Sequence, residues 1–284
     1  MLGGVKYSSI ALVLAGLLAL AGSQGGIAYR GVPVFALCAL LAFALQWLAF
    51  VPAYYLQTEK FYDLTGSLTF IALALLALAL GGDTDARSSL LVACVLIWAL
   101  RLGSYLFSRI LRDGSDTRFD RIKPVASRFF LTWTLQGLWV LTTLACALAA
   151  LTTPERVDLQ WFDLIGFGLF LSGFAVEVIA DQQKRRHRAH YGPDRFIDSG
   201  LWRHSRHPNY FGEITLWCGI SLLAAPALSG WQWVTLVSPV FVTVLLTRIS
   251  GIPLLERKAD QRWGDDPQYQ AYKNNTPVLL PFWH

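Results

Sequence analysis

Long apolar runs separated by short polar stretches dominate the chain, and each run has the length of a membrane-spanning helix. Because a helix rises about 1.5 Å per residue, about 20 apolar residues cross a hydrocarbon core of roughly 30 Å. We therefore expect an all-α transmembrane helical bundle of seven to eight spans, with residues 1–284 forming a single integral membrane domain. The runs lie at about 5–24, 31–56, 64–81, 88–110, 129–152, 160–180, 210–228 and 231–250.

The first of these runs has a second interpretation, because a short N-terminal apolar stretch is also typical of a signal peptide. The stretch that follows it, Ser23-Gln24-Gly25-Gly26, is a weak cleavage site. We therefore expect a retained helix within residues 1–30. A seven-span arrangement without it leaves all later loops on the same sides.

Basic residues are concentrated in alternate loops. If every run crosses, one side has the N-terminus, the loop around Lys60, the loops 111–128 and 181–209, and the C-terminal tail. That side takes 20 of the 24 Lys and Arg residues, the others being Arg101 inside a run and Arg30, Arg87 and Arg156 opposite. Since basic residues are retained in the cytoplasm, both termini and these loops are expected there.

Composition excludes a soluble protein. Hydrophobic residues make up 54% of the chain and charged residues only 15%, with a mean hydropathy of +0.44, whereas soluble domains carry about 25% charge. The net charge of +5 follows the loop asymmetry, so it does not indicate nucleic-acid binding. Each cysteine stands alone within an apolar run, which indicates neither a disulfide nor a metal site; the four are Cys38, Cys94, Cys146 and Cys218.

The strongest polar cluster extends from Asp181 to Glu213 and ends at the start of the seventh run. Pro208 is suited to the first turn of a helix, whose free N–H groups attract anionic phosphate. Arginines bind the phosphates of a dinucleotide bidentately, and Arg188 and Arg195 lie in this cluster. A basic loop that contacts lipid headgroups is the alternative interpretation.

Two smaller clusters also carry ionisable groups. The stretch Gln57-Thr58-Glu59-Lys60-Phe61-Tyr62-Asp63 lies between two runs, and charges drawn to membrane depth are functional candidates. A simple interfacial loop explains it equally well. In the fourth run, Arg101 and Tyr105 are four residues apart and so share a helix face. Arg101 either points into the bundle or extends to the interface.

The motif Leu201-Trp202-Arg203-His204-Ser205-Arg206-His207-Pro208-Asn209-Tyr210-Phe211-Gly212-Glu213, followed by Trp217, resembles the C-terminal signature of the steroid 5-alpha-reductase family. The chain is most similar to the bacterial membrane-protein branch of that family, over about residues 31–284, which implies a bacterial inner-membrane location. The stretches 59–67 and 251–256 support the resemblance. The first helix is additional to the human-type enzymes.

This resemblance implies an NADPH-dependent oxidoreductase that reduces the C=C bond of a steroid or lipid enone. It implies a cofactor site formed by Arg101, Tyr105, Asp181, Arg188, Arg195, Arg206, His207, Asn209, Tyr210 and Glu213. It implies catalytic roles for Glu59 and Tyr62, with Gln57 and Trp98 at the substrate. The family's Gln-Glu pair is Thr58-Glu59 in this chain, and Trp98 stands where the family has a tyrosine. The steroid is therefore a weaker implication than NADPH.

In the expected reaction, negative charge develops on the enone oxygen, so a hydrogen-bond donor placed there stabilises the transition state. Glu59 is expected to be that donor if burial keeps it protonated, and Tyr62 is the other candidate for the same role. The expected partners are membrane lipids and a hydrophobic substrate, with no metal. An S-adenosylmethionine-dependent methyltransferase of the isoprenylcysteine carboxyl type is the leading alternative, because it shares a looser Arg-His-Pro-x-Tyr-x-Gly pattern. A transporter or scaffold is a third.

Overall fold

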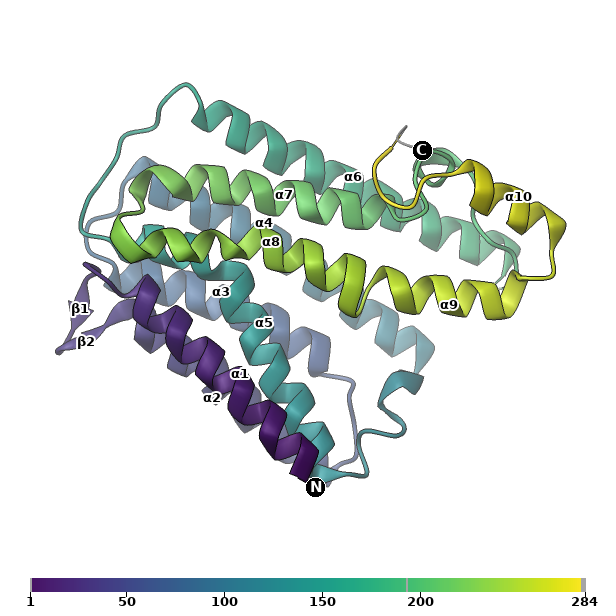
Figure 1. The fold of residues 1–284 in the computed structure, drawn as a ribbon, viewed down its shortest axis with the longest axis horizontal. Coiled ribbons are helices and arrows are strands. Elements are labelled where there is room, and N and C mark those ends of the chain that lie inside the picture. Colours follow the sequence, from purple (N-terminus) through teal and green to yellow (C-terminus); the bar gives the residue numbers. More distant parts are fainter. Residues whose placement is uncertain (1, 193, 282–284) are drawn as a thin grey trace. The chain divides into compact units, whose positions relative to one another are not determined.

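The structure is a computed structural model that describes residues 2–192 and 194–281. Its elements are almost entirely helical (Figure 1). The helices are α1 (Leu2–Gly22), α2 (Val34–Tyr55), α3 (Tyr62–Leu80), α4 (Ala86–Asp113), α5 (Ala126–Thr152), α6 (Asp163–Tyr191), α7 (Pro208–Ala224), α8 (Val237–Val244), α9 (Ile252–Trp263) and α10 (Pro267–Asn275).

Short elements connect these helices. Strands β1 (Ala28–Tyr29) and β2 (Val32–Pro33) pair antiparallel in a small hairpin between α1 and α2. Short 3₁₀ helices η1–η4 occupy Thr117–Phe119, Gly200–Arg203, Ala225–Ala227 and Gly230–Leu236. A π-helical turn at Leu245–Ile249 joins α8 to the bend before α9.

Seven helical stretches of the described chain are long and apolar enough to cross a membrane. Six of them correspond to the first six predicted runs, and the seventh extends from Gly230 to Trp263. The remaining predicted run, now α7, has 17 residues and is not among the seven. The chain is therefore an all-α, multi-pass integral membrane protein, as the hydropathy pattern predicts. The cytoplasmic orientation of its termini stays a prediction.

The chain packs as two compact units, each of which is described by itself. The first comprises Met1–Gln160 with Leu223–Ser238, and the second comprises Trp161–Leu222 with Pro239–His284. The prediction of a single membrane domain stays a prediction.

Helix α5 forms the centre of the first unit. It contacts α1, α2 and α3, and every residue from Val140 to Thr153 is buried. A helix that is apolar on all sides belongs in an interior, and the run of small residues here lets its neighbours approach closely. Helix α1 packs against it through Ala11 and Ala15.

Helices α6 and α7 of the second unit touch backbone to backbone through glycines (Figure 1). A Cβ atom on Gly212 of α7 would lie 2.6 Å from the carbonyl oxygen of Gly173 and 2.7 Å from the amide nitrogen of Glu177. A Cβ on Gly219 would meet the backbone of Gly166 and Phe170 in the same way. This contact allows no side chain, so it sets the separation of the two helices.

Candidate functional site

The glycine contact brings two predicted nucleotide residues together at one end of the helix pair. Asp181 lies two turns beyond Gly173 on α6, and Asn209 lies in the first turn of α7. The side-chain amide of Asn209 donates a 3.2 Å hydrogen bond to Asp181 Oδ1, and Asp181 is buried. The sequence predicted both residues for the cofactor, and the structure places them in direct contact.

The residues just before α7 form an ionic network with α9. Glu256 of α9 accepts a 2.8 Å hydrogen bond from His207 Nε2, and its other oxygen lies 3.0 Å from Arg206 Nη1. The imidazole of His207 also stacks on the ring of Tyr210, with centroids 5.8 Å apart. Three predicted cofactor residues, Arg206, His207 and Tyr210, therefore lie in one cluster. Glu256, the last residue of the stretch 251–256, is its acidic partner.

Burial lowers the pKa of His207, and the cations Lys184 and Arg206 lower it further, although the contact with Glu256 opposes them. The ring is therefore neutral near neutral pH. A neutral imidazole that donates from Nε2 has Nδ1 left as an acceptor.

Buried polar atoms without a described hydrogen-bond partner collect at this helix start. They are Arg206 Nε, His207 Nδ1 and Asn209 Oδ1. Buried polar atoms are normally satisfied, because an unpaired one costs about 1–3 kcal/mol. One donor and two acceptors suit a ligand that presents both hydroxyl groups and anionic oxygens, as a ribose phosphate does.

The end of α6 carries different side chains on opposite faces. At ~100° per residue, Asp181, Lys184 and Arg188 fall on one face. Arg188 is exposed. Arg195 follows α6, and its guanidinium lies 4.7 Å from the ring centroid of Tyr191. The two arginines predicted to bind the cofactor phosphates therefore lie on different segments, Arg188 on the last turns of α6 and Arg195 in the loop after it.

Aromatic contacts hold the loop after α6 in place. Trp202 donates its indole N–H to the carbonyl of Ala180 at 3.0 Å, while Lys184 lies over its ring. Tyr272 of α10 donates to the Trp202 carbonyl at 2.7 Å, and its ring stacks on Phe196. The C-terminal residues therefore position the loop that carries the predicted cofactor residues.

The chain segment after α10 also supports the start of α7. The backbone N–H of Arg206 donates to the carbonyl of Pro277 at 2.9 Å. Ser205, which is fully buried, donates to the carbonyl of Leu279 at 2.8 Å. Glu213, the last predicted cofactor residue, lies one turn after Asn209 and is partly buried.

The predicted catalytic residue Glu59 lies in the first unit and is buried. It accepts a 2.8 Å hydrogen bond from the backbone N–H of Asp116 and forms an ion pair with Lys123. Only 3% of its side chain is exposed, against 15% for Lys123. The sequence did not single out Lys123 or Asp116, because both lie about 60 residues away in a loop rich in charges.

The expectation that burial keeps Glu59 protonated is wrong for this arrangement. Burial alone raises the pKa of Glu59, but the ammonium of Lys123 and the amide of Asp116 outweigh it, so the pKa lies below its ordinary value. Glu59 is therefore a carboxylate that accepts hydrogen bonds. Its role in catalysis stays a prediction, and in this arrangement its oxygens are occupied by Lys123 and the Asp116 amide.

The other predicted substrate residues are found in three different settings. Tyr62 donates its hydroxyl to the carbonyl of Thr132 at 3.0 Å and packs edge-on against Trp133 and Phe119. Gln57 is exposed and folds back to the carbonyl of Tyr54. Trp98 is fully buried and meets Phe70 edge-on. Glu59 thus lies in the loop just before α3 and Tyr62 is the first residue of that helix, whereas the Gln57 side chain is exposed.

Arg101 and Tyr105 of α4 contact each other, since the guanidinium lies 5.2 Å from the ring centroid. This confirms that they share a helix face. They belong to the first unit, whereas the other predicted cofactor residues belong to the second.

A known family matches residues 49–276 of the chain. The chain belongs to the DUF1295 family, which is described as a protein of unknown function. The matched region of this DUF1295 protein begins inside α2, later than the resemblance predicted, and includes all the predicted site residues, from Gln57 to Glu213. Helix α1 lies outside it.

Three proteins are similar to this DUF1295 chain. An uncharacterised protein of Schizosaccharomyces pombe, C594.04c, is 28% identical over 247 residues, covering 75% of this chain and 69% of that protein. The 3-oxo-5-alpha-steroid 4-dehydrogenase 1 of Rattus norvegicus is 29% identical over 121 residues, and that of Macaca fascicularis is 30% identical over 120. These matches cover 42% of this chain and 41% and 40% of the respective enzymes. No solved structure matches.

The two mammalian relatives support a coarse conclusion. Their similarity to this chain is distant and partial, and both are named 3-oxo-5-alpha-steroid 4-dehydrogenase 1. The chain is therefore distantly similar to steroid oxidoreductases, whereas its own reaction, cofactor and substrate need a separate argument.

Proposed function

We propose that this protein uses NADPH to reduce the C=C bond of a hydrophobic enone, of the 4-ene-3-oxo steroid type or a lipid analogue. The observation that carries the proposal is the buried start of α7, where Arg206, His207 and Asn209 keep polar atoms without described partners. The names of the two mammalian relatives supply the reaction type.

The residues at the start of α7 suit a dinucleotide. Asn209 and His207 offer acceptors for ribose hydroxyls, and Arg206 offers a donor for a phosphate oxygen. Arg188 and Arg195 add cationic side chains that favour the extra phosphate of NADPH over NADH. NADPH, when bound, supplies the hydride; the chain binds it, orients it and excludes water.

In this proposal the residues of the first unit act on the substrate. Tyr62 is the proposed donor to the carbonyl oxygen, for which its hydroxyl must leave the Thr132 carbonyl. Glu59 holds Lys123, whose ammonium supplies positive charge for an oxygen that becomes negative.

Ligand-induced stabilisation tests the proposal. Purified protein is titrated with NADPH, NADH and S-adenosylmethionine while its melting temperature is followed, since a ligand that binds the folded state alone stabilises it. NADPH should raise the melting temperature at the lowest concentration. Selective stabilisation by S-adenosylmethionine would show a methyltransferase and exclude the reductase.

A further inference from the structure

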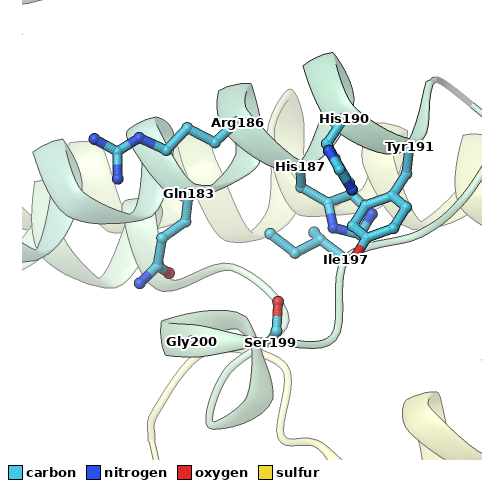
Figure 2. Close-up of a pocket in the computed structure, with 8 residues that line it drawn as sticks. All are labelled: Gln183, Arg186, His187, His190, Tyr191, Ile197, Ser199 and Gly200. Carbon is cyan, nitrogen blue, oxygen red and sulfur yellow. The ribbon is translucent and has the colours of Figure 1, made fainter.

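A hollow of about 400 Å³ lies against the last turns of α6, within the second unit (Figure 2). Gln183, Arg186, His187 and His190 line it from α6, and Ser199 and Gly200 line it from the loop that returns beneath them. At ~100° per residue, these four α6 residues centre on the face opposite Asp181 and Arg188, and Lys184 lies between the two groups, next to His187. The hollow is therefore separate from the residues assigned to the nucleotide.

The chemistry of the lining favours an anion. Its residues include one arginine and two histidines, with the hydroxyl of Ser199 and the amide of Gln183, but no aspartate or glutamate. Figure 2 shows the Ser199 hydroxyl directed toward α6, while the Gln183 amide points down to the loop. Donors grouped without an acid typically bind phosphate oxygens. Figure 2 shows the Arg186 guanidinium extended along α6, so it must swing over the hollow to take part.

Gly200 is required for this arrangement. Its φ of +63° is one that other residues rarely adopt, and an added Cβ would lie 2.5 Å from the Gln183 side-chain nitrogen. Gln183 Oε1 accepts a 2.9 Å hydrogen bond from the N–H of Leu201. Because the oxygen of the Gln183 amide accepts this bond, its NH₂ group is the part that can donate to a ligand.

His187 adds a polar atom that its surroundings do not satisfy. Its Nε2 is buried and has no hydrogen-bond partner among the described residues. The ring is held by Tyr191, whose centroid is 4.8 Å away. A ligand oxygen or hydroxyl in the hollow gives this nitrogen the partner that buried polar atoms ordinarily have.

We propose that this hollow binds a phosphate group through Arg186, His187 and Ser199, with Gln183 fixed over Gly200 as a further donor. The apolar part of α6 ends at Ala180, one turn before Gln183. Headgroup phosphates lie just outside the hydrocarbon core, so this depth suits a phospholipid headgroup as well as a free phosphate.

The test uses the full chain without nucleotide, in neutral detergent, with the melting temperature as the measurement. One arm titrates inorganic phosphate. The other compares phosphatidylglycerol with diacylglycerol, which has no phosphate. Arg186→Ala is compared with Arg185→Ala, a matched control, because Arg185 is also exposed and adjacent but does not line the hollow.

Phosphate, phosphatidylglycerol or both should stabilise the wild type, and diacylglycerol should not. The Arg186→Ala variant should need at least about tenfold more ligand for the same rise in melting temperature, since a charged hydrogen bond is lost. Ser199→Ala should weaken phosphate binding less than Arg186→Ala does, and Arg185→Ala should leave it unchanged. Stabilisation by phosphate alone identifies a free anion, and stabilisation by the lipid alone identifies a headgroup.

Two results would overturn the proposal. Equal losses in Arg185→Ala and Arg186→Ala would mean that the whole basic surface attracts anions, without a built site. The absence of stabilisation by either source of phosphate would contradict the site altogether. NADPH stabilisation should be unchanged in Arg186→Ala, which separates this hollow from the nucleotide residues.

Discussion

At the scale of single residues, the ion pair of Glu59 and Lys123 is the most strongly buried charge pair of the first unit among the described contacts. Such a pair contributes little net stability compared with apolar packing, but breaking it leaves one charge buried alone. The pair joins the loop after α2 to the loop before α5. Its role is therefore to hold two loops together around the start of α3.

Glu59→Gln should lower the free energy of unfolding by about 3 kcal/mol or more, because Lys123 is left without its carboxylate. The double variant Glu59→Gln with Lys123→Met should recover part of that loss. Melting temperatures of the four proteins of this cycle measure the coupling, with the exposed Asp120→Asn as a control. Additive effects of the two changes would contradict the pairing.

The same pair should make stability depend on pH. The pKa of Glu59 is lowered from its ordinary value of 4.5 in the folded chain, so its contribution is fully present above that value. It is lost as the pH falls from about 4.5 through the lowered pKa. The stability difference between wild type and Glu59→Gln, measured from pH 7 downward, should shrink over that range. A constant difference would mean that Glu59 is not ionised.

Arg188 is the residue through which the cofactor proposal is most directly tested. Arg188→Ala should weaken the binding of NADPH by about tenfold or more and that of NADH by less, since a charged hydrogen bond to the extra phosphate is lost. Competition between the two nucleotides in a thermal-shift titration measures the ratio. Arg185→Ala removes the same charge one turn earlier and is the control. Equal losses for both nucleotides would exclude Arg188 from reading that phosphate.

At the scale of elements, the glycine contact of α6 and α7 determines where Asn209 meets Asp181. The contact lies three residues after Asn209 on α7 and eight before Asp181 on α6. Any added side chain must push apart two backbones, which are stiffer than side chains. The site is therefore sensitive to changes at residues that bear no chemistry themselves.

Gly212→Ala should destabilise the protein by about 1–3 kcal/mol, because its Cβ meets backbone atoms. It should also weaken NADPH stabilisation by separating Asn209 from Asp181. Gly168→Ala is the matched control, since a Cβ on Gly168 meets nothing within 4 Å. Both effects are measured by thermal shift with and without NADPH. An unchanged melting temperature in Gly212→Ala would contradict the close contact.

At the scale of the whole molecule, the basic residues have two different uses. Most lie in loops, where they direct orientation. Arg87, one of the few predicted on the other side, is instead buried and donates to the carbonyls of Val157, Asp158 and Leu223 at 3.0, 3.0 and 2.6 Å. Arg87 therefore satisfies backbone carbonyls of two other segments. Its charge has this structural role and does not argue against the predicted orientation.

The orientation is tested by thiol labelling. In a Cys218→Ser background, whose other cysteines are buried, a cysteine is placed at Ser115 or at Asp83, both exposed in loops. An impermeant reagent should label Asp83→Cys in intact cells and Ser115→Cys only after permeabilisation. The reverse pattern would place the two loops on the opposite sides from those that the basic residues predict.

Hydropathy by itself predicted seven of the eight runs as long apolar helices, because the apolar length of a helix is a local property of the chain. The structure added that α7 is shorter and that α5 is buried at the centre of its unit. The family resemblance implied that Asp181 and Asn209 belong to one site, and the structure places them in contact, while their role at the cofactor stays a prediction. Helical spacing likewise predicted that Arg101 and Tyr105 meet.

Only the tertiary structure decided which partners the charges have. Whether Glu59 is an acid or a carboxylate depends on Lys123 and Asp116, which are distant in sequence, and burial alone suggested the opposite result. The hollow of Gln183, Arg186 and His187 was missed although these residues share one helix face, because only the returning loop at Ser199 and Gly200 closes it. Local sequence patterns determine which side chains share a helix face. The packing of distant segments determines which charges and polar groups surround those side chains.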